Sequence, residues 1–442
     1  MERTLIADLK GHVGETVTIN GWVSVRRDQG KMVFFDVRDR SGTIQGVVLP
    51  KSDAIDIAKD TSIETPVLMS GMVNARPEKN VVVDKQNGDI ELQIESIEIL
   101  SLAQTLPFEL DAELNIDTLF DYRPLTLRRP RERAIFKVQA VLVSSYREFL
   151  QKEGFMEFQA PKFVGDDAEG GGNIFRVEYF KDKHAYLATS PQLYKEIMVG
   201  VFERVFAVGN VFRAEKHSTT RHLNEYTSMD VEFGFINDHR DVMRMENRLF
   251  KHIVTRLHEE CEAEFKLLGS EIPVVPDEIP HMKLREAQAL ITAETGADCT
   301  NEPDLEPEHE RWLCAYSREK LGSDFIFITH YPVAKRPFYT MEDSDDPGFT
   351  KSFDLLFRGV EIATGGQRVH NYDMMIEKLK TKNLNSENFS FYLQAFKYGM
   401  PPHGGWGMGL ERLTQKMLGL DNAKEAALFP RDMNRIDVRL SE

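Results

Sequence analysis

The first hundred residues alternate apolar and polar side chains with a period of two, in short runs separated by Gly, Asp and Asn. Four such runs cover residues 16–27, 32–49, 66–75 and 90–100. This alternation is typical of half-buried β-strands, and several short strands at this spacing indicate a small barrel. With a helical spacer near 52–59, their order predicts a five-stranded OB-fold, which often binds single-stranded nucleic acid. A structural barrel without a ligand is the alternative.

After the last run, prolines and charged residues interrupt the alternation, as they would in a linker. A helical pattern then covers 132–154 and ends at Gly154, a typical C-terminal cap. Strand-like segments follow, with helices between them at 239–261 and 371–382. We therefore expect an α+β protein. Its predicted parts are a barrel domain in 1–104, a linker or hinge in 105–130 and a second domain in 131–442.

The chain has 442 residues and a net charge of −16 at pH 7. This charge argues against affinity for nucleic acid spread over the whole surface, because phosphates would meet a repulsive average field. A local basic run remains at 122–137, which is either a solvated helix start or a hinge that faces RNA.

No apolar run reaches the roughly 20 residues that a membrane helix needs, and the N-terminal residues lack a signal-peptide pattern. We expect a cytoplasmic protein without a membrane anchor. Cys261, Cys299 and Cys314 are widely spaced and match no metal-binding pattern. They are predicted to be reduced structural thiols.

A segment rich in charge lies between two predicted strands at 211–232. Arg213 offers a planar, permanently charged fork for phosphate, and Glu215 can accept from an exocyclic amine such as that of adenine. The segment also contains Arg221, His222, Glu225, Asp230 and Glu232. This layout suits a charged ligand held between antiparallel strands, and a solvated hairpin loop is the alternative.

Asp354 and Glu361 are seven positions apart, and an intervening bend would bring both carboxylates to one metal. Such hard oxygen ligands suit Mg²⁺ that bridges phosphates, although a surface pair is the alternative. Gln192 and Lys195 follow a Ser-Pro turn and share one helix face, where they either clamp a carboxylate or face solvent. Glu169 lies in a glycine-rich loop that is either a lid or a plain surface loop.

In this order, the segments resemble the class II aminoacyl-tRNA synthetases, and within them the aspartyl family of the compact archaeal type. The resemblance covers nearly the whole chain and includes three class motifs. These are the helix and strand ending at Pro161, the hairpin at 212–232 and Gly-Met-Gly-Leu-Glu-Arg at 407–412. It implies an OB-fold anticodon-binding domain followed by a catalytic domain whose antiparallel β-sheet is flanked by helices.

The resemblance assigns roles to residues that match the family motifs. Arg213 would be catalytic, binding the α-phosphate and the substrate carboxylate. Phe235 would stack on one face of adenine and Arg412 on the other. The implied ATP-binding set is Arg213, Glu215, Arg221, His222, Leu223, Phe235, Glu361, Gly409, Leu410, Glu411 and Arg412. The implied Mg²⁺ ligands are Asp354, Glu361 and Thr364, where Thr364 replaces an expected serine but keeps a hydroxyl.

An aspartate side chain needs cations, and the resemblance assigns this role to Lys195 and Arg368. The asparaginyl family looks different at Lys195, and a lysine-specific pocket would need carboxylates there. Asp230 would pair with the α-ammonium group. The implied aspartate-binding set is Glu169, Gln192, Lys195, Arg213, Asp230, Thr364 and Arg368. The glycines at 404, 405, 407 and 409 lack the Lys-Ser/Thr ending of a P-loop; they would instead let adenine and aminoacyl groups approach the backbone.

The implied activity is ATP-dependent attachment of L-aspartate to tRNA-Asp through an aspartyl-adenylate. In the barrel, Arg27, Phe34 and Gln45 would contact the anticodon, unless Phe34 belongs to the core. Charging of tRNA-Asn stays open, because Ser24 and Glu78 match neither expected pattern.

Three alternatives to this activity remain. They are an asparaginyl-tRNA synthetase, a synthetase-like RNA-binding protein without catalysis and a freestanding enzyme that makes asparagine on the same fold. The non-catalytic protein would be expected to lack ATP or metal ligands, and the barrel argues against the freestanding enzyme. The resemblance also implies a homodimer formed around Pro161.

Overall fold

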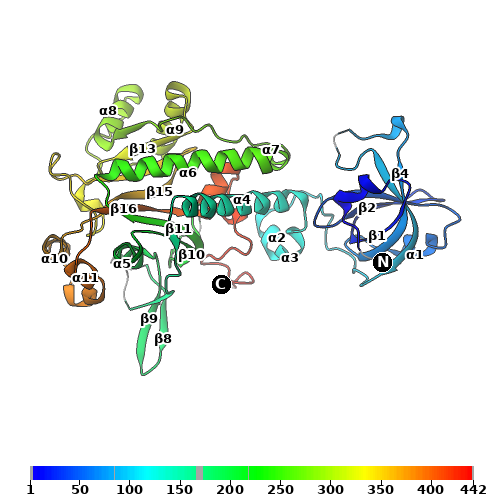
Figure 1. The fold of residues 1–442 in the computed structure, drawn as a ribbon, viewed down its shortest axis with the longest axis horizontal. Helices are drawn as coiled ribbons and strands as arrows, with labels where there is room; N and C mark the ends of the chain where they lie inside the picture. The colour runs from blue at the N-terminus through cyan, green and yellow to red at the C-terminus, as the bar shows by residue number, and fades with distance from the viewer. Residues whose placement is uncertain (1–2, 84, 166–172, 218, 441–442) are drawn as a thin grey trace. The chain divides into compact units, whose positions relative to one another are not determined.

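The computed structural model describes residues 3–83, 85–165, 173–217 and 219–440. The chain forms two compact units, Met1–Ala112 and Glu113–Glu442, which are described separately (Figure 1).

The N-terminal unit is a closed five-stranded barrel with the strand order β1-β2-β3-β5-β4. Its strands are β1 (Thr16–Asp28), β2 (Val33–Arg38), β3 (Thr43–Val48), β4 (Pro66–Ala75) and β5 (Ile90–Ile99). A short helix, α1 (Ile55–Asp60), lies between β3 and β4, where the sequence predicts a helical spacer. On β2, Val33, Phe35 and Val37 point into the barrel and are fully buried. The predicted OB-fold is therefore confirmed.

The larger unit is built on an eight-stranded sheet with the order β12-β13-β14-β15-β16-β11-β10-β6. The strands are β6 (Met156–Glu157), β10 (Arg204–Phe212), β11 (Glu225–Gly234), β12 (His281–Lys283), β13 (Phe325–Thr329), β14 (Ser352–Phe357), β15 (Val360–Gln367) and β16 (His403–Gly409). The strands from β13 to β10 pair antiparallel, whereas the edge strands β12 and β6 pair parallel with their neighbours. The α+β class is confirmed, with a mixed rather than a purely antiparallel sheet.

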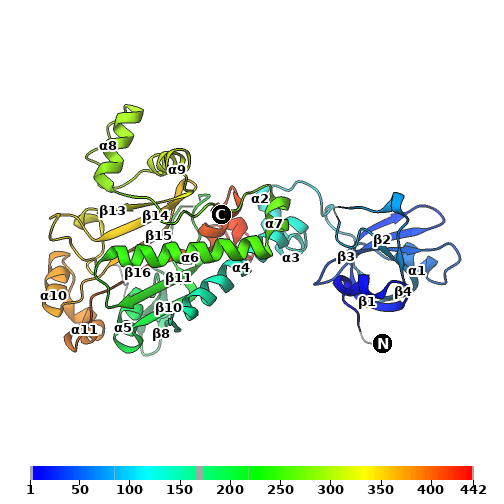
Figure 2. The same ribbon diagram turned by 45° about the horizontal axis from the view of Figure 1, so that its top comes forward.

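Two long helices, α4 (Pro130–Lys152) and α6 (His239–Glu260), run side by side across one face of this sheet (Figures 1 and 2). The expected linker contains α2 (Ile116–Asp121) and α3 (Arg123–Thr126). The other helices are α5 (Gln192–Phe202), α7 (Glu262–Leu268), α8 (Leu284–Thr295), α9 (Pro307–Leu321), α10 (Tyr372–Thr381), α11 (Ser390–Lys397) and α12 (Leu410–Leu418). A separate small sheet has the order β7-β9-β8, with β7 (Phe163–Val164), β8 (Arg176–Tyr179) and β9 (Lys183–Leu187).

Strand β11 shows why one face of the large sheet is apolar and the other polar. Met229, Val231 and Phe233 belong to the core that α4 and α6 cover. Because successive strand residues point to opposite faces, Ser228 and Asp230 lie on the other face, where a cavity forms. The period-two pattern of one strand thus supplies both the core and the polar cavity face.

The hairpin from β14 to β15 positions the predicted metal ligands. Its two turn residues, Arg358 and Gly359, have φ angles of 46° and 85°, as a type I′ turn requires. The pairing register then shifts between Leu355 and Leu356, so that Asp354 lies opposite Thr364 and Leu356 opposite Glu361. This β-bulge places Asp354, Glu361 and Thr364 on the same face of the sheet.

The glycine-rich segment is a strand that runs directly into a helix, since β16 ends at Gly409 and α12 begins at Leu410. The sequence pattern predicts one strand-like segment over 404–413, and this prediction is wrong after Gly409, where the helix begins. Gly407 and Gly409 line the cavity, as expected. At Gly405, by contrast, an added Cβ would meet the backbone oxygen of Val231 at 1.9 Å, so this glycine is required by strand packing.

A Gly405→Ala substitution should therefore destabilise the protein by about 3 kcal/mol, because the neighbouring strand must move. The matched substitution Gly409→Ala should cost no more than about 1 kcal/mol, since its Cβ would meet only ordinary contacts beginning at 3.8 Å. Urea unfolding of both variants measures the difference. Equal midpoints would contradict the packing explanation.

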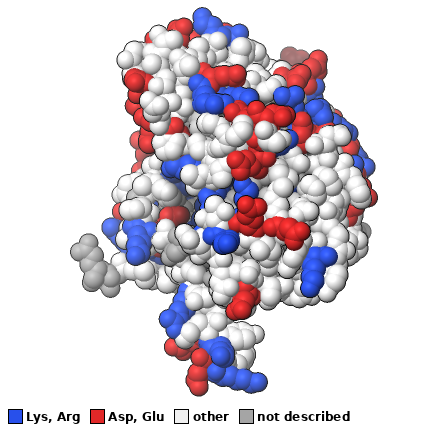
Figure 3. All heavy atoms as spheres, turned by 90° about the vertical axis from the view of Figure 1, so that its left-hand side faces the viewer, with Lys and Arg blue, Asp and Glu red and all other residues white. Residues whose placement is uncertain are grey.

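All three cysteines are buried and free, as predicted. Among the described residues, no helix is long and apolar enough to cross a membrane. Basic and acidic side chains are mixed on the face shown in Figure 3.

Candidate active site

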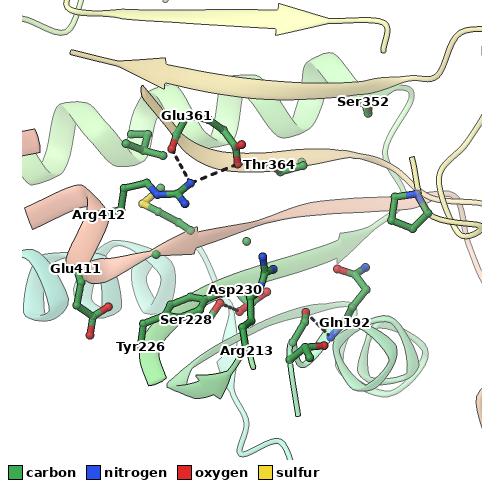
Figure 4. A pocket seen from close by; sticks show the side chains of 18 of the residues that line it. Gln192, Arg213, Tyr226, Ser228, Asp230, Ser352, Glu361, Thr364, Glu411 and Arg412 are labelled. Carbon is green, nitrogen blue, oxygen red and sulfur yellow. Dashed lines mark hydrogen bonds and ion pairs between the residues drawn. The ribbon is translucent and has the colours of Figure 1, made fainter. Parts of the chain in front are cut away.

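A cavity of about 430 Å³ lies on the polar face of the large sheet (Figure 4). Most of the predicted substrate and ATP residues line it, although they come from distant parts of the chain. They are Gln192, Arg213, Glu215, Arg221, His222, Leu223, Asp230, Glu361, Thr364, Arg368, Gly409, Glu411 and Arg412.

Four predicted residues do not line this cavity. Lys195 and Asp354 lie beneath its surface, Leu410 belongs to the core and Phe235 is exposed elsewhere. Glu169 lies outside the described residues.

Arg213 and Glu215 are fixed by the backbone that follows β10. The side-chain amide of Asn224 donates to the carbonyl oxygens of Arg213 and Glu215, at 2.8 and 3.3 Å. The Arg213 N–H in turn donates to the Asn224 carbonyl at 2.9 Å. The two ends of the charged segment are thereby tied together at the cavity.

Tyr226 was not predicted but lines the cavity next to Arg213, whose guanidinium carbon lies 5.9 Å from the centre of the Tyr226 ring. The alternation along β11 contained the signal, because residue 226 shares a face with 228 and 230. Phe235 follows the end of β11 at a positive φ of 59° and is 72% exposed. The structure does not bring Phe235 to the cavity, and its expected position beside adenine is not supported.

A buried ionic network underlies the predicted aspartate site. The Lys195 ammonium lies 3.1 Å from Asp230 Oδ1 and 3.4 Å from Glu232 Oε2, and donates to the Trp406 carbonyl at 2.9 Å. Arg368 donates to Glu232 Oε1 at 3.0 Å and to the Gly405 carbonyl at 3.0 Å. Burial alone would lower the pKa of Arg368, but its negatively charged neighbours, Glu232 foremost, together outweigh burial and raise the pKa. Both predicted cations are therefore held by carboxylates of the protein itself.

Asp354, Glu361 and Thr364 supply the oxygens of the predicted metal site. The Thr364 hydroxyl donates to Glu361 Oε1 at 2.7 Å, and Asp354 Oδ1 lies 2.8 Å from Arg336. Burial, together with repulsion by Glu361, raises the pKa of Asp354 to about 6 although Arg336 opposes the shift. Two carboxylates that repel each other on one sheet face suit a divalent cation. Within the described ranges, no set of three or more His, Cys, Asp and Glu side chains could hold a metal.

Arg412 and Glu411 lie in the first turn of α12. Arg412 donates to the Glu361 carbonyl at 3.0 Å, and its side chain points across the cavity toward Thr364 (Figure 4). The Thr227 N–H donates to both Glu411 oxygens, at 3.1 and 3.0 Å. Burial outweighs these bonds and raises the pKa of Glu411 from 4.5 to about 7.

The raised pKa of Glu411 predicts a pH-dependent stability. A carboxyl group whose pKa is higher in the folded state stabilises the fold at pH values below 4.5, and this contribution is lost as the pH rises through 7. The glutamine in Glu411→Gln does not titrate, so this variant does not lose that contribution. Its free energy of unfolding, relative to that of the wild type, should therefore rise by on the order of 1 to 3 kcal/mol between pH 5 and pH 8. Urea unfolding at both pH values tests this, with the exposed Glu377→Gln as control. A difference that does not change with pH would contradict it.

Arg221 has a partner that the sequence did not predict. Its guanidinium lies 3.6 Å from Glu310 of α9. Burial and repulsion by Glu361 raise the pKa of Glu310 to about 7. Glu310 comes from a distant helix, so no local sequence pattern could have revealed the pair.

In the barrel, the predicted anticodon residues lie together. Arg27 pairs across the sheet with Phe34, and Asp36 pairs with Gln45, so all four side chains share the outer face. Phe34 is only half-buried, whereas Phe35 belongs to the core, so the core alternative for Phe34 is wrong. Ser24 donates to the Asp36 carbonyl, and Glu78 is exposed.

Comparison with known proteins agrees with this fold. The family described as tRNA synthetases class II (D, K and N) matches residues 115–433, and the OB-fold nucleic acid binding domain matches residues 17–100. The chain therefore belongs to the class II tRNA synthetases of this group.

Individual proteins that are similar to this chain over nearly their whole length have aspartate or asparagine in their names. The protein named Aspartate--tRNA(Asp/Asn) ligase from Deinococcus radiodurans is 46% identical over 99% of both chains. The protein of the same name from Thermus thermophilus is 46% identical over 98% of this chain and 99% of its own. The crystal structure of asparaginyl-tRNA synthetase from Pyrococcus horikoshii with asparaginyl-adenylate superimposes with a TM-score of 0.91, at 31% identity and 99% coverage of both chains.

Proposed function

We propose that this protein is an aspartate–tRNA ligase that couples ATP cleavage to the attachment of L-aspartate to tRNA. One observation carries the proposal: a cavity brings together Arg213, Glu361 and Arg412. Arg368, which belongs to the buried ionic network described above, lines the same cavity. The relatives named above support aspartate over asparagine, since those with aspartate in their names are more similar in sequence than the asparaginyl enzyme.

The reaction has two steps. A carboxylate oxygen of aspartate attacks the α-phosphorus of ATP, and pyrophosphate leaves with the electron pair of the broken bond. A terminal ribose hydroxyl of tRNA then attacks the aspartyl carbonyl, loses its proton and releases AMP. Arg213 stabilises the negative charge that develops on the α-phosphate, so positioning and electrostatics supply the catalysis.

The aspartate side chain is selected by charge. Arg368 lines the cavity and Lys195 lies beneath it. The side-chain carboxylate of the substrate aspartate therefore binds near two cations. Asp230 pairs with the α-ammonium group. A neutral amide side chain lacks the charge that this arrangement favours.

The nucleotide lies between two side chains of the cavity. Tyr226 provides an aromatic face for adenine, in the role that the family resemblance assigned to Phe235, and Arg412 packs a cation on the other face. Asp354, Glu361 and Thr364 would hold Mg²⁺, which neutralises charge on the phosphates when bound. In the same part of the cavity, Arg221 and His222 bind the outer phosphates.

The outer face of the barrel binds the anticodon, with Phe34 stacking on a base and Arg27 and Gln45 contacting phosphate or base edges. Charging of tRNA-Asn in addition to tRNA-Asp is a second candidate, favoured by the printed names of the two relatives. Aspartylation of purified tRNA-Asp and tRNA-Asn side by side decides between one and two tRNA substrates.

The chain forms a homodimer through the first motif. An open groove along α4 supports this arrangement, because residues such as Phe136 and Val143 leave apolar surface there beside Leu410 and Leu428. Light scattering of the eluted protein measures the mass, and a monomer would reject the dimer.

The activity is tested by the exchange of labelled pyrophosphate into ATP. Exchange should require aspartate and should not occur with asparagine or lysine. Exchange supported by asparagine alone would overturn the proposed substrate. No exchange with any of the three amino acids, but retained tRNA binding, would favour the non-catalytic RNA-binding alternative.

A further inference from the structure

Helix α5 places the carboxylate of Glu196 directly behind the cavity, and none of the roles above uses this residue. Gln192 lines the cavity at the first residue of α5, and Glu196 follows one turn later. Figure 4 shows Gln192 pointing from the helix into the cavity. Glu196 is fully buried, so it cannot contact the substrate from where it lies.

Every hydrogen-bond partner that Glu196 shows is a donor. Gln192 Nε2 donates to Glu196 Oε1 at 2.7 Å. The Tyr392 hydroxyl donates to Oε2 at 2.7 Å, and His403 Nε2 lies 3.2 Å from the same oxygen. A fully buried carboxylate is costly unless donors surround it, and these three donors come from three separate elements.

His403 is held on both sides of its ring, with Glu196 on one side. Its Nδ1 lies 2.9 Å from the Pro401 carbonyl oxygen, which can only accept, so Nδ1 bears a hydrogen. Its Nε2 faces Glu196 Oε2 on the other side of the ring, so the imidazole bridges the carboxylate and the Pro401 carbonyl. Burial opposes the ionisation of Glu196, but His403 and Arg368 outweigh it and lower its pKa.

An ionised Glu196 determines which way the Gln192 amide points. A carboxylate has no hydrogen to donate, so it accepts only from the amide NH₂ and never from the amide oxygen. The NH₂ group is therefore turned away from the cavity and the carbonyl oxygen is turned toward it. An acceptor oxygen at this place suits the α-ammonium group of an amino acid, which offers three donors.

We propose that Glu196, held in place by Tyr392 and His403, is a positioning residue that fixes the Gln192 carbonyl toward the substrate ammonium group. This inference rests on the proposed function, because it concerns the aspartate site of the same cavity. It predicts an effect on amino-acid binding without an effect on ATP.

The first test replaces Glu196 by glutamine, which keeps the shape but can donate as well as accept. Gln192 then loses its fixed orientation. In pyrophosphate exchange, KM for aspartate should rise about 10- to 100-fold, the range that corresponds to a weakened hydrogen bond to a charged group. KM for ATP should stay within about twofold, the scatter expected when no contact is lost. Wild-type exchange tests the proposed function separately, so failure of one idea is distinguishable from failure of the other.

The second test is a double-mutant cycle with Gln192→Ala. If Glu196 acts through Gln192, the double variant should bind aspartate no more weakly than Gln192→Ala alone. Ser317→Ala is the control for disturbing a buried hydrogen bond in the same unit, since Ser317 donates to Ser323 and Phe325 carbonyls away from the cavity.

Three outcomes would overturn the proposal. The first is an unchanged KM for aspartate in a folded Glu196→Gln variant. The second is a pair of effects that multiply in the double variant, because Glu196 would then act independently of Gln192. Equal increases in both KM values would assign Glu196 a general structural role and reject the positioning role.

Discussion

Replacing Arg213 by alanine should lower kcat/KM for aspartate-dependent pyrophosphate exchange by about 10³-fold. The guanidinium lies in the cavity, and its backbone is fixed by Asn224 at both ends of the charged segment. A donor held in place before the reaction stabilises developing phosphate charge without reorganising during the step. The loss should appear mainly in kcat, because the contact strengthens in the transition state.

Arg213→Lys is the matched control for this prediction. Lysine keeps the charge but lacks the planar fork, so its activity should lie between those of the wild type and the alanine variant. Pre-steady-state formation of aspartyl-adenylate measures the step directly. Adenylate formation at the wild-type rate in Arg213→Ala would remove Arg213 from its catalytic role.

The second large effect is expected for Lys195→Met. The ammonium group is fully buried and pairs with Asp230 and Glu232, so its removal leaves buried carboxylates with less compensation. Breaking a buried ion pair from one side costs about 3 to 5 kcal/mol. Urea unfolding should show this loss, and aspartate activation should fall below detection.

Asp230→Asn added to Lys195→Met separates stability from activity. The second substitution removes the uncompensated charge, so much of the lost stability should return while activity does not. Glu232 keeps Arg368 as its partner at 3.0 Å. Wild-type stability of the variant that carries Lys195→Met alone would show that the buried network is not required for folding.

Some parts of the site could be predicted from the sequence, because the position of a side chain within its own strand determines the face on which it lies. Alternation along β11 places Ser228 and Asp230 on one face, and the same counting extends to Tyr226. The role of Phe235 came from the family resemblance instead, and Phe235 lies beyond this pattern, because β11 ends at Gly234 and the chain then passes through a positive φ angle. Periodicity gives the face of a side chain only while the strand continues.

The internal partners of the site could not be predicted in this way. Lys195 was expected to contact the substrate, but its partners lie on a strand that the helix meets only in the folded chain. Glu310 and Glu196 were missed for the same reason. Their contacts with Arg221 and His403 join elements far apart in sequence, so only the tertiary structure reveals them.

The bulge in β15 has a consequence for comparing sequences. A regular ladder with the same turn would place Ala363 opposite Asp354 and turn the Thr364 hydroxyl to the apolar side. The extra residue, Ile362, shifts the following residues by one position and so returns the Thr364 hydroxyl to the cavity face. In a chain without this residue, the glutamate and the threonine would lie two positions apart in sequence instead of three, and both would still lie beside Asp354. The same ligand geometry can therefore be written with two different spacings, and a comparison that forbids gaps would recognise only one of them.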